Sequence, residues 1–318
     1  MAITFAGTTT QSQNQNHLAT VYYDRLALTR LTPQFRFYAI GSKRPVPQGV
    51  GKTIQFFRRN VPAYNTSPSA EGVIPAPFSN GTATISATVE QYSDYMSTST
   101  MIEDTSITNE VEGMVEDLTI RAAGSVDTIT RLEIDSNSSQ ITDTAGTNLA
   151  ANDLKKRVFT LLGQNVLPYE GTNFIAVTHP YAVYDIVVDT TTGGFIDALK
   201  YQQGQKVLDG EIGMIASTRL MTSTNVGNDA TAAPNTKYYT YIFGKESFGC
   251  VDLTGRGPSD VTDPQKERFK VNVIKGGPSA TDPTGEIGTY VSYRFVFAAK
   301  TFDKNRFQIP KAKVAIGL

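Results

Sequence analysis

The pattern of hydrophobic and polar positions predicts one long amphipathic helix in the first half of the chain. Between residues 106 and 135, apolar side chains recur at steps of three and four, the spacing that places them on one face of a helix. Two pairs of opposite charge at i,i+4, Asp117 with Arg121 and Asp127 with Arg131, are expected to add small stabilising contributions on its surface. A helix of this length needs a neighbouring element to cover its apolar face.

The chain before this helix predicts a long two-stranded arm. The string TIQFFRRN, from Thr53, has strand-forming residue types, and residues 82–100 are rich in Thr, Ser, Val, Ile and Tyr without Gly or Pro. Between them, residues 62–81 contain four prolines and two glycines, which indicates an irregular tip. Isolated two-stranded hairpins are at best marginally stable in water, so an arm over residues 50–100 needs a surface to lie on.

Helix and strand signals alternate through the rest of the chain, which predicts an α+β body of mixed connectivity. A short helix is expected at residues 17–31 and a polar connector at residues 136–151. The further expected helices are residues 152–163, 180–188 and 194–203, and the expected strands are residues 173–178, 214–221, 238–243, 269–274 and 290–299. No internal repeat and no flexible linker divides the sequence into independent domains.

Composition indicates a folded chain with a weakly charged surface. The 318 residues are 40% hydrophobic and 19% charged, with a formal net charge of −1, which gives no overall attraction to nucleic acid or to an anionic membrane. The single cysteine, Cys250, excludes an internal disulfide and a cysteine-rich metal site. No apolar run approaches the roughly 20 residues of a membrane-spanning helix, and the first residues lack a secretion-signal pattern. We therefore expect a soluble cytoplasmic product.

Charge is distributed unevenly along the chain. Residues 25–70 hold eight basic residues and no acid, whereas residues 71–153 hold fourteen acids and two arginines. The basic segment interleaves Arg and Lys with Phe and Tyr, a pattern compatible with binding a nucleic-acid backbone and stacking on bases. The alternative is that it meets the acidic segment of an adjacent copy. Because the chain carries its own acidic segment, self-complementarity is the favoured interpretation.

Motifs for catalysis or metal binding are incomplete. GVGKT at residues 49–53 resembles the end of a phosphate-binding loop, but the motif needs a glycine where Val46 stands, and here the turn precedes a strand instead of following one. His17 and His179 have no second His or Cys at ligand spacing. Carboxylate pairs in the acidic segment are solvated groups by default. We therefore expect no enzymatic activity, no catalytic residue, no cofactor and no metal.

Taken in order, these features resemble the major capsid protein of tailed bacteriophages, which has the Hong Kong 97 fold. The strings that carry the resemblance are KRPVPQGVGKTIQFFRRN, AEGVIPAPF, ISATVEQYSDYMSTSTMIEDTS, GFIDALKYQQGQKVLDGEIGMIASTRLM and FGKESFG. They look closest to the capsid family of the enterobacteria phage N-four group. The resemblance covers nearly the whole chain from about residue 17, and it is specific in order and spacing rather than in any one motif.

The resemblance implies an α+β fold with an N-terminal arm, an extended β-hairpin loop, a long spine helix, a peripheral domain and an inserted axial domain. The expected divisions are the N-terminal arm and first helix at 1–45, the extended loop at 46–101, the spine helix and peripheral domain at 102–150, the axial domain at 151–265, and the return strands of the peripheral domain at 266–318.

The resemblance also implies the function and the partners. The expected role is self-assembly into the icosahedral shell that encloses the double-stranded DNA genome of a tailed phage. The expected partners are many copies of the chain as hexamers and pentamers, a portal protein, scaffold or decoration proteins, and packaged DNA on the inner face without sequence specificity. No membrane partner is expected. The location is the virion capsid, after assembly in the host bacterial cytoplasm.

In such a shell each extended loop lies over a neighbouring subunit, and the basic loop and the acidic spine region set the register. The residues expected at contacts between subunits lie in the loop, just before it, or in the first turns of the spine helix: Arg44, Lys52, Phe56, Phe57, Arg58, Arg59, Phe78, Glu110, Glu112 and Glu116. Burial of the three phenylalanines is expected to matter more than the charges, because an exposed ion pair contributes only about 0 to 1 kcal/mol.

Three alternatives remain open from the sequence. An encapsulin-type nanocompartment has the same fold and packages enzyme cargo, so neighbouring genes would separate it from a phage shell. A different class is an oligomeric hydrolase with a cryptic site, which would need a pocket of convergent titratable groups. A tail-tube or other virion component would differ in particle shape under the electron microscope.

Overall fold

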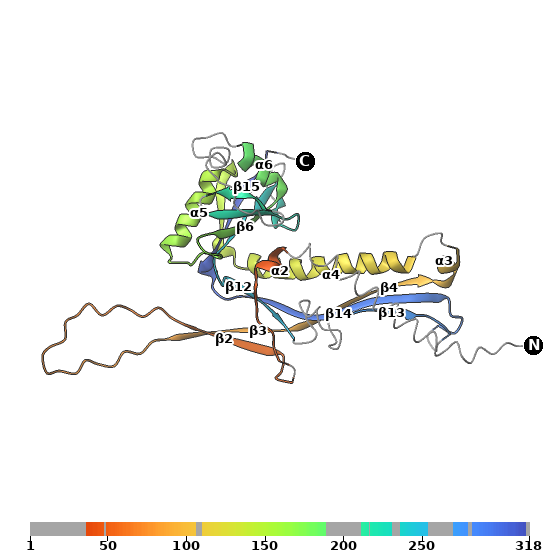
Figure 1. The fold of residues 1–318 in the computed structure, drawn as a ribbon, viewed down its shortest axis with the longest axis horizontal. Helices are drawn as coiled ribbons and strands as arrows, with labels where there is room; N and C mark the ends of the chain where they lie inside the picture. The colour runs from red at the N-terminus through yellow and green to blue at the C-terminus, as the bar shows by residue number, and fades with distance from the viewer. Residues whose placement is uncertain are drawn as a thin grey trace, which may run out of the picture.

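The computed structural model describes residues 36–47, 49–105, 110–188, 211–215, 217–230, 236–253, 270–278 and 282–315. These residues form an upper body, a long helix that lies on a sheet, and a thin two-stranded arm that projects away from both (Figure 1). The helices expected at residues 17–31 and 194–203, and the expected N-terminal arm over most of its length, lie outside the described residues.

The predicted long helix is confirmed as α4, Glu110–Asp135, which lies along strand β14, Ile287–Thr301 (Figure 1). Its buried face includes Val115, Leu118 and Val126, and each fully buried side chain of this size stabilises the fold by about 1.5–3 kcal/mol. In the five-stranded sheet below it, β14 pairs with β4 (Glu90–Ser99), β12 (Phe248–Asp252) and β13 (Lys270–Lys275), and β12 pairs with β1 (Ser42–Lys43).

The single strand expected over residues 82–100 is two strands that separate at Val89. Strand β3, Thr82–Thr88, pairs antiparallel with β2, Thr53–Arg59, and these two strands form the arm. Strand β4, Glu90–Ser99, instead pairs with β14 in the sheet below α4. The arm is therefore shorter than the pattern predicts.

The second half of the expected strand joins the body because its side chains find apolar partners there. Tyr92 of β4 stacks on Phe295 of β14, with ring centroids 5.5 Å apart. Thr98 is buried near the other end of the same strand. A strand that buries one face on its own chain is stable without a second copy. The surface of a second copy is therefore required only by β2, β3 and the loop between them.

The upper body is built on a second sheet of eight strands among the described residues. Its order is β7 (Glu211–Ile215), β8 (Thr218–Thr222), β6 (Phe174–Thr178), β11 (Tyr241–Phe243), β15 (Phe307–Lys313), β10 (Lys237–Tyr239) and β9 (Asn228–Asp229), with β5 (Ile141–Asn148) also paired to β15. Helices α5, Ala151–Gly163, and α6, Pro180–Val188, pack on it through Leu154, Leu161 and Ile186.

Most of the expected elements of this body are confirmed, with shifted boundaries. Helices α5 and α6 and strand β6 lie within one residue of their predicted positions. The strands expected at residues 214–221 and 238–243 each divide into two. Ser217, in the first break, has a positive φ of 59°, which marks a tight turn between β7 and β8.

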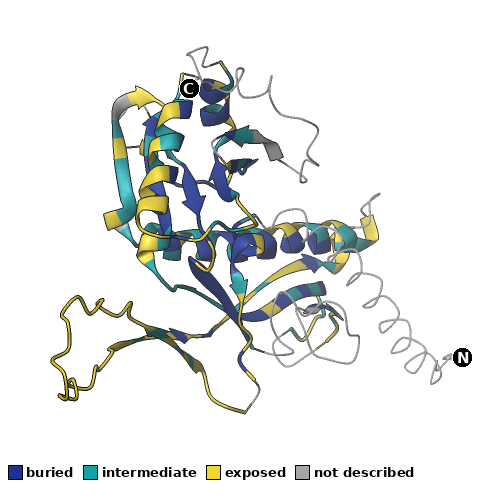
Figure 2. Ribbon diagram, turned by 60° about the vertical axis from the view of Figure 1, so that its left-hand side comes forward, coloured by how far each residue is buried: buried dark blue, intermediate teal, exposed yellow. Residues whose placement is uncertain are grey.

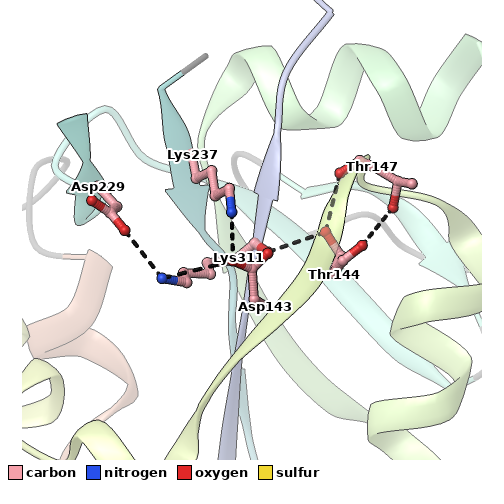
Figure 3. A network of polar contacts seen from close by, with 6 residues as sticks. All are labelled: Asp143, Thr144, Thr147, Asp229, Lys237 and Lys311. Atoms are coloured by element: carbon pink, nitrogen blue, oxygen red, sulfur yellow. Dashed lines mark hydrogen bonds and ion pairs between the residues drawn. The ribbon is translucent and has the colours of Figure 1, made fainter. Parts of the chain in front are cut away.

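The segment expected as a polar connector, residues 136–151, contains strand β5, which runs parallel to β15. Polar contacts hold β5 in place (Figure 3): the Asp143 carboxylate accepts a hydrogen bond from Lys237, and Lys311 binds Asp229 at 3.0 Å. The Thr144 hydroxyl donates to the carbonyl of Lys311 at 3.1 Å. The hydrophobic pattern missed this strand because polar contacts and edge pairing fix it.

The end of the chain divides between the two sheets. Of the return strands expected at residues 266–318, β13 and β14 lie in the sheet below α4, whereas β15 lies in the upper sheet. Phe307 and Ile309 of β15 are fully buried there. The turn that joins the two strands, residues 302–306, therefore lies where the two sheets meet the base of the arm (Figure 1).

The charges of α4 do not form the two expected pairs: Arg131 binds Asp135 within the helix, at 2.9 Å, and Arg121 and Asp127 bind distant elements. Arg121 binds Asp94 of β4 at 2.6 Å. The Asp127 carboxylate accepts hydrogen bonds from the N–H groups of Phe37 and Tyr38, at 2.8 and 3.3 Å. These N–H groups lie in the first turn of α2, Arg36–Ile40, where backbone N–H groups have no partner within the helix. The Asp127 carboxylate accepts their hydrogen bonds, as the side chain of an N-cap residue does. Burial raises the pKa of Asp127, and these hydrogen bonds oppose the rise.

Candidate functional site

The tip of the arm, residues 60–81, is a long loop that touches no part of the body. Every residue from Asn60 to Thr82 is exposed (Figure 2). This described stretch contains no helix, and its only strand residue is Thr82, where β3 begins. The loop nevertheless carries large apolar side chains: Ile74 is 92% exposed and Phe78 is 64% exposed. Apolar groups gathered on such a thin projection indicate a surface that is covered in the working state of the protein.

Strand β2 has two different faces. Side chains alternate along a strand, and here Ile54, Phe56 and Arg58 are half-buried toward the body. The opposite face exposes Phe57, at 75%, and Arg59. One face of β2 therefore packs against its own chain, and the opposite face is exposed.

The inner face of the arm rests on the turn between β14 and β15. The ring of Phe56 lies edge-on to the ring of Phe302, with centroids 4.7 Å apart. The guanidinium group of Arg58 binds the Asp303 carboxylate at 2.5 Å. The Phe302 ring in turn lies on Gly249 of β12, where a Cβ atom would overlap it. These contacts fix the direction in which the arm leaves the body.

A pocket of about 360 Å³ opens at this junction. Its rim is charged, with Arg44, Arg58 and Arg306 facing the carboxylates of Glu246 and Asp303. The apolar side chains that line it come from both the arm and the turn and include Ile54, Phe56, Ile85 and Phe302. Three guanidinium groups against two carboxylates leave one positive charge in excess.

The chain turns into the arm at a glycine-rich corner. Gly49 and Gly51 have φ angles of 83° and 102°, which residues with a side chain rarely adopt. The corner leads directly into β2, so GVGKT is a structural turn, as its order in the sequence predicts. The other end of the hairpin is fixed by Val89, which is buried with Val46 and Val251.

The three acidic residues expected at contacts lie far from the arm. Glu110, Glu112 and Glu116 are in the first turns of α4, at the end of the spine helix remote from β2 and β3 (Figure 1). Glu110 is exposed, and the other two are half-buried. One chain therefore does not bring its basic loop and its acidic helix start together, and any pairing between them requires two copies.

The loop residues expected at contacts fall into two groups. Phe56 and Arg58 bind their own body, and Arg44 lines the pocket. Lys52, Phe57, Arg59 and Phe78 are exposed. Sequence reasoning missed the partners at the base of the arm, Phe302, Asp303, Glu246 and Arg306, because nothing in a turn between two strands shows which distant hairpin it will meet.

The titratable groups buried in the body serve structural roles. Tyr241 donates to the Asp135 carboxylate at 2.6 Å, and burial raises the pKa of both groups. Burial also raises the pKa of Cys250 to about 11. His179 stacks on Tyr238, with centroids 4.2 Å apart, and burial lowers its pKa.

Neither a metal-binding cluster nor a membrane-spanning helix occurs in the described part of the chain. Among these residues, no group of three or more His, Cys, Asp or Glu side chains is placed to hold a metal ion. No described helix combines the length and the apolar character that crossing a membrane requires.

No protein-family model matches the sequence, and no curated protein sequence matches it. Solved structures match over most of the chain. The capsid of cyanophage P-SCSP1u is 13% identical, with 86% of each chain covered and a TM-score of 0.61. The capsid of Ralstonia phage GP4 is 10% identical, again over 86% of each chain, with a TM-score of 0.62.

The same fold occurs outside phages. The SrpI encapsulin complex of Synechococcus elongatus is 11% identical to this chain, with 88% of each chain covered and a TM-score of 0.54. At such identities the likeness establishes the fold, which is the α+β fold of Hong Kong 97-type capsid proteins. The extended loop, the spine helix and the two sheets all belong to it.

Proposed function

We propose that this chain is the major capsid protein of a tailed bacteriophage, a structural subunit that assembles with many copies of itself into an icosahedral shell around double-stranded DNA. The observation that carries the proposal is the arm. Its loop of more than twenty exposed residues holds apolar side chains as large as Phe78 and Ile74, and none of them has a place on its own body. A second copy of the chain supplies the missing surface.

The contacts within one chain support an arm whose direction is fixed before it binds a neighbouring copy. Phe56 and Arg58 hold the base of β2 against residues 302–306, while Phe57 and Arg59 point the other way. An arm with a fixed direction loses less conformational entropy on binding than a free one. We therefore assign Phe57, Arg59 and Phe78 to contacts between subunits, and Phe56 and Arg58 chiefly to the support of the arm.

The charge asymmetry supports contacts between unlike surfaces of identical copies. The exposed Arg59 and Lys52 of the arm and the carboxylates of Glu110, Glu112 and Glu116 lie at opposite ends of one chain. Pairing between them joins the arm of one copy to the start of the spine helix of the next. Such exposed pairs contribute about 0 to 1 kcal/mol each, so they direct the register, and apolar burial supplies most of the free energy of association.

The finer assignments follow from the resemblance of sequence strings. We propose that the chain is related to the capsid family of the enterobacteria phage N-four group. Copies assemble as hexamers and pentamers in the host bacterial cytoplasm, with a portal protein and scaffold or decoration proteins as partners. Packaged DNA contacts the inner face without sequence specificity. We assign the protein no enzymatic activity.

The proposal is tested by producing the protein with and without the products of its neighbouring genes and examining it by size-exclusion chromatography and negative-stain electron microscopy. We expect closed icosahedral shells. A chain that stays monomeric under every condition, or that forms tubes, would contradict the proposal.

An encapsulin-type shell is the second candidate, because the SrpI encapsulin has the same fold over 88% of this chain. The content of the particles separates the two functions. Particles purified from cells that express the native gene neighbourhood are expected to contain double-stranded DNA and a portal protein, whereas a nanocompartment would contain a cargo enzyme and no DNA.

A further inference from the structure

The arginines at the rim of the pocket, at the base of the arm, can bind a further carboxylate beside the two that the rim itself supplies. Glu246 lies between Arg306, at 3.5 Å, and Arg44, at 3.9 Å, and the Arg44 contact is too long for a hydrogen bond. Asp303 is shared between Arg58, at 2.5 Å, and Arg306, at 3.6 Å. The side chain of Arg44 is 54% exposed at the mouth of the pocket, so its donors are accessible to an incoming carboxylate.

The tip of the arm carries a matching group. Glu71 is the only acidic residue between positions 60 and 81. It lies at the apex of a turn that is closed by the Val73 N–H donating to the Ala70 carbonyl at 3.2 Å and that places Gly72 at a φ of 76°. Exposed apolar side chains follow directly at Val73 and Ile74.

Tip and pocket are therefore complementary in two respects. The tip presents one carboxylate followed by two aliphatic side chains, and the pocket presents an arginine rim over a lining of Phe56, Phe302 and Ile85. Apolar burial supplies most of the favourable free energy of such a contact, and the charged pair fixes its orientation. The pocket volume of about 360 Å³ is large enough to receive side chains of this size.

We propose that the tip of the arm, Ala70–Ile74, docks into the pocket at the base of the arm of a second copy, with Glu71 bound by Arg44 and its neighbours. This inference rests on the proposed function and names the acceptor surface for the arm. The pocket is lined by residues of β2 and β3, and the loop at residues 60–81 extends away from these strands and from the body (Figure 1), so a chain cannot fill its own pocket. The contact is head-to-tail, and repeating it closes a ring when its rotation divides a full circle.

Disulfide trapping tests this contact directly, because the only native cysteine is the buried Cys250. Cysteines are introduced at Ala70, in the tip, and at Lys245, beside the pocket, which leaves Glu71 and the three arginines intact. After mild oxidation of assembled particles, we expect a ladder of covalently linked multimers on a non-reducing gel. The control pair joins the cysteine at Ala70 with Tyr184→Cys, on the exposed face of α6, a helix at the far side of the upper body from the arm (Figure 1), and is expected to give no ladder.

A charge exchange provides the second test. Glu71→Arg places a cation against the arginine rim and is expected to raise the chain concentration required for assembly by about tenfold. Arg44→Glu alone is expected to act in the same direction. Glu71→Arg combined with Arg44→Glu restores the opposite charges and is expected to recover most of the loss.

The outcomes separate this inference from the proposed function. Shells that form normally, give no ladder with the Ala70 and Lys245 pair, and show no rescue in the charge exchange would overturn the docking site and leave the capsid function standing. Failure of the unsubstituted chain to form shells would instead overturn the proposed function. A ladder from dilute, dispersed chains that equals the ladder from shells would also overturn the docking site, because it would not depend on assembly.

Discussion

At the scale of single residues, the direction of the arm depends on how closely Phe302 approaches the sheet. Its ring lies on Gly249 of β12, and only the absence of a side chain at that position permits the approach. From there the ring supports Phe56 of β2. The position of the arm relative to the sheet therefore depends on the absence of a side chain at Gly249.

Gly249→Val is expected to displace Phe302 and to loosen the base of the arm. A Cβ would overlap the ring, and overpacking of this kind typically costs about 1–3 kcal/mol. Thermal unfolding should show the lower stability, and the yield of shells should fall as well. Gly124→Ala is the matched control: no atom lies within 4 Å of its Cβ, so in the middle of α4 it should stabilise the protein by up to about 1 kcal/mol. Equal stability of the two variants would contradict this account of the arm.

Cys250 provides a prediction about reactivity. Burial raises the pKa of its thiol to about 11, so the folded chain keeps it protonated at pH 8, and the thiolate forms only as the pH approaches that value. Native protein at pH 8 should therefore react with iodoacetamide at a small fraction of the rate of unfolded protein, as measured by intact mass. Rapid modification of native protein would show that the site opens.

At the scale of elements, α4 and β2 could be predicted because their patterns are local. The apolar positions of α4 repeat at helical spacing, and they cover β14. β5 and β15 could not be placed in the same way: β5 is held by polar contacts such as Asp143 with Lys237, and β15 reaches the upper sheet only through the path of the chain. Local pattern identifies an element, whereas topology decides its partner.

The same distinction applies to the candidate site. Phe57, Arg59 and Phe78 could be proposed from sequence because they belong to a segment that has no core of its own. The pocket could not be proposed, since Glu246, Phe302 and Arg306 come from turns that converge only after both sheets have formed. The residue types indicate the chemical character of the tip, whereas only the three-dimensional fold shows the pocket proposed to accept it.

Neighbouring arginines of β2 should respond differently to charge reversal. Arg59→Glu alters an exposed side chain and should leave the unfolding temperature unchanged while it impairs assembly. Arg58→Glu places a carboxylate against Asp303, and because that pair is partly exposed, the loss of stability should be only about 1 kcal/mol or less. Chemical denaturation and particle yield, measured on both variants, test the assignment. Normal shells from Arg59→Glu would remove that residue from the contacts.

At the scale of the whole molecule, the body and the arm have separate roles. The body has hydrophobic clusters of its own beneath α4 and around β6, whereas residues 60–81 contribute no buried side chain. Stability of the monomer should therefore depend on the body and on the base of the arm that packs against it, and association should depend on residues 60–81.

Replacing residues 60–81 with a two-residue Asn-Gly turn tests that separation. Such a turn joins antiparallel strands directly, so β2 and β3 can still pair. The shortened chain should be a folded monomer with an unfolding temperature close to that of the full chain, and it should form no shells, even at high concentration. A shortened chain that fails to fold, or one that assembles normally, would contradict the separation.

The central claim is that the arm gains its stability on another copy of the chain. A cryo-electron microscopy map of assembled particles, at a resolution that traces residues 60–81, tests it most directly. We predict ordered density for that loop on the surface of a neighbouring subunit, with Ile74 and Phe78 buried between the two chains. A map in which the loop folds back onto its own body, with no neighbour in contact, would contradict the account.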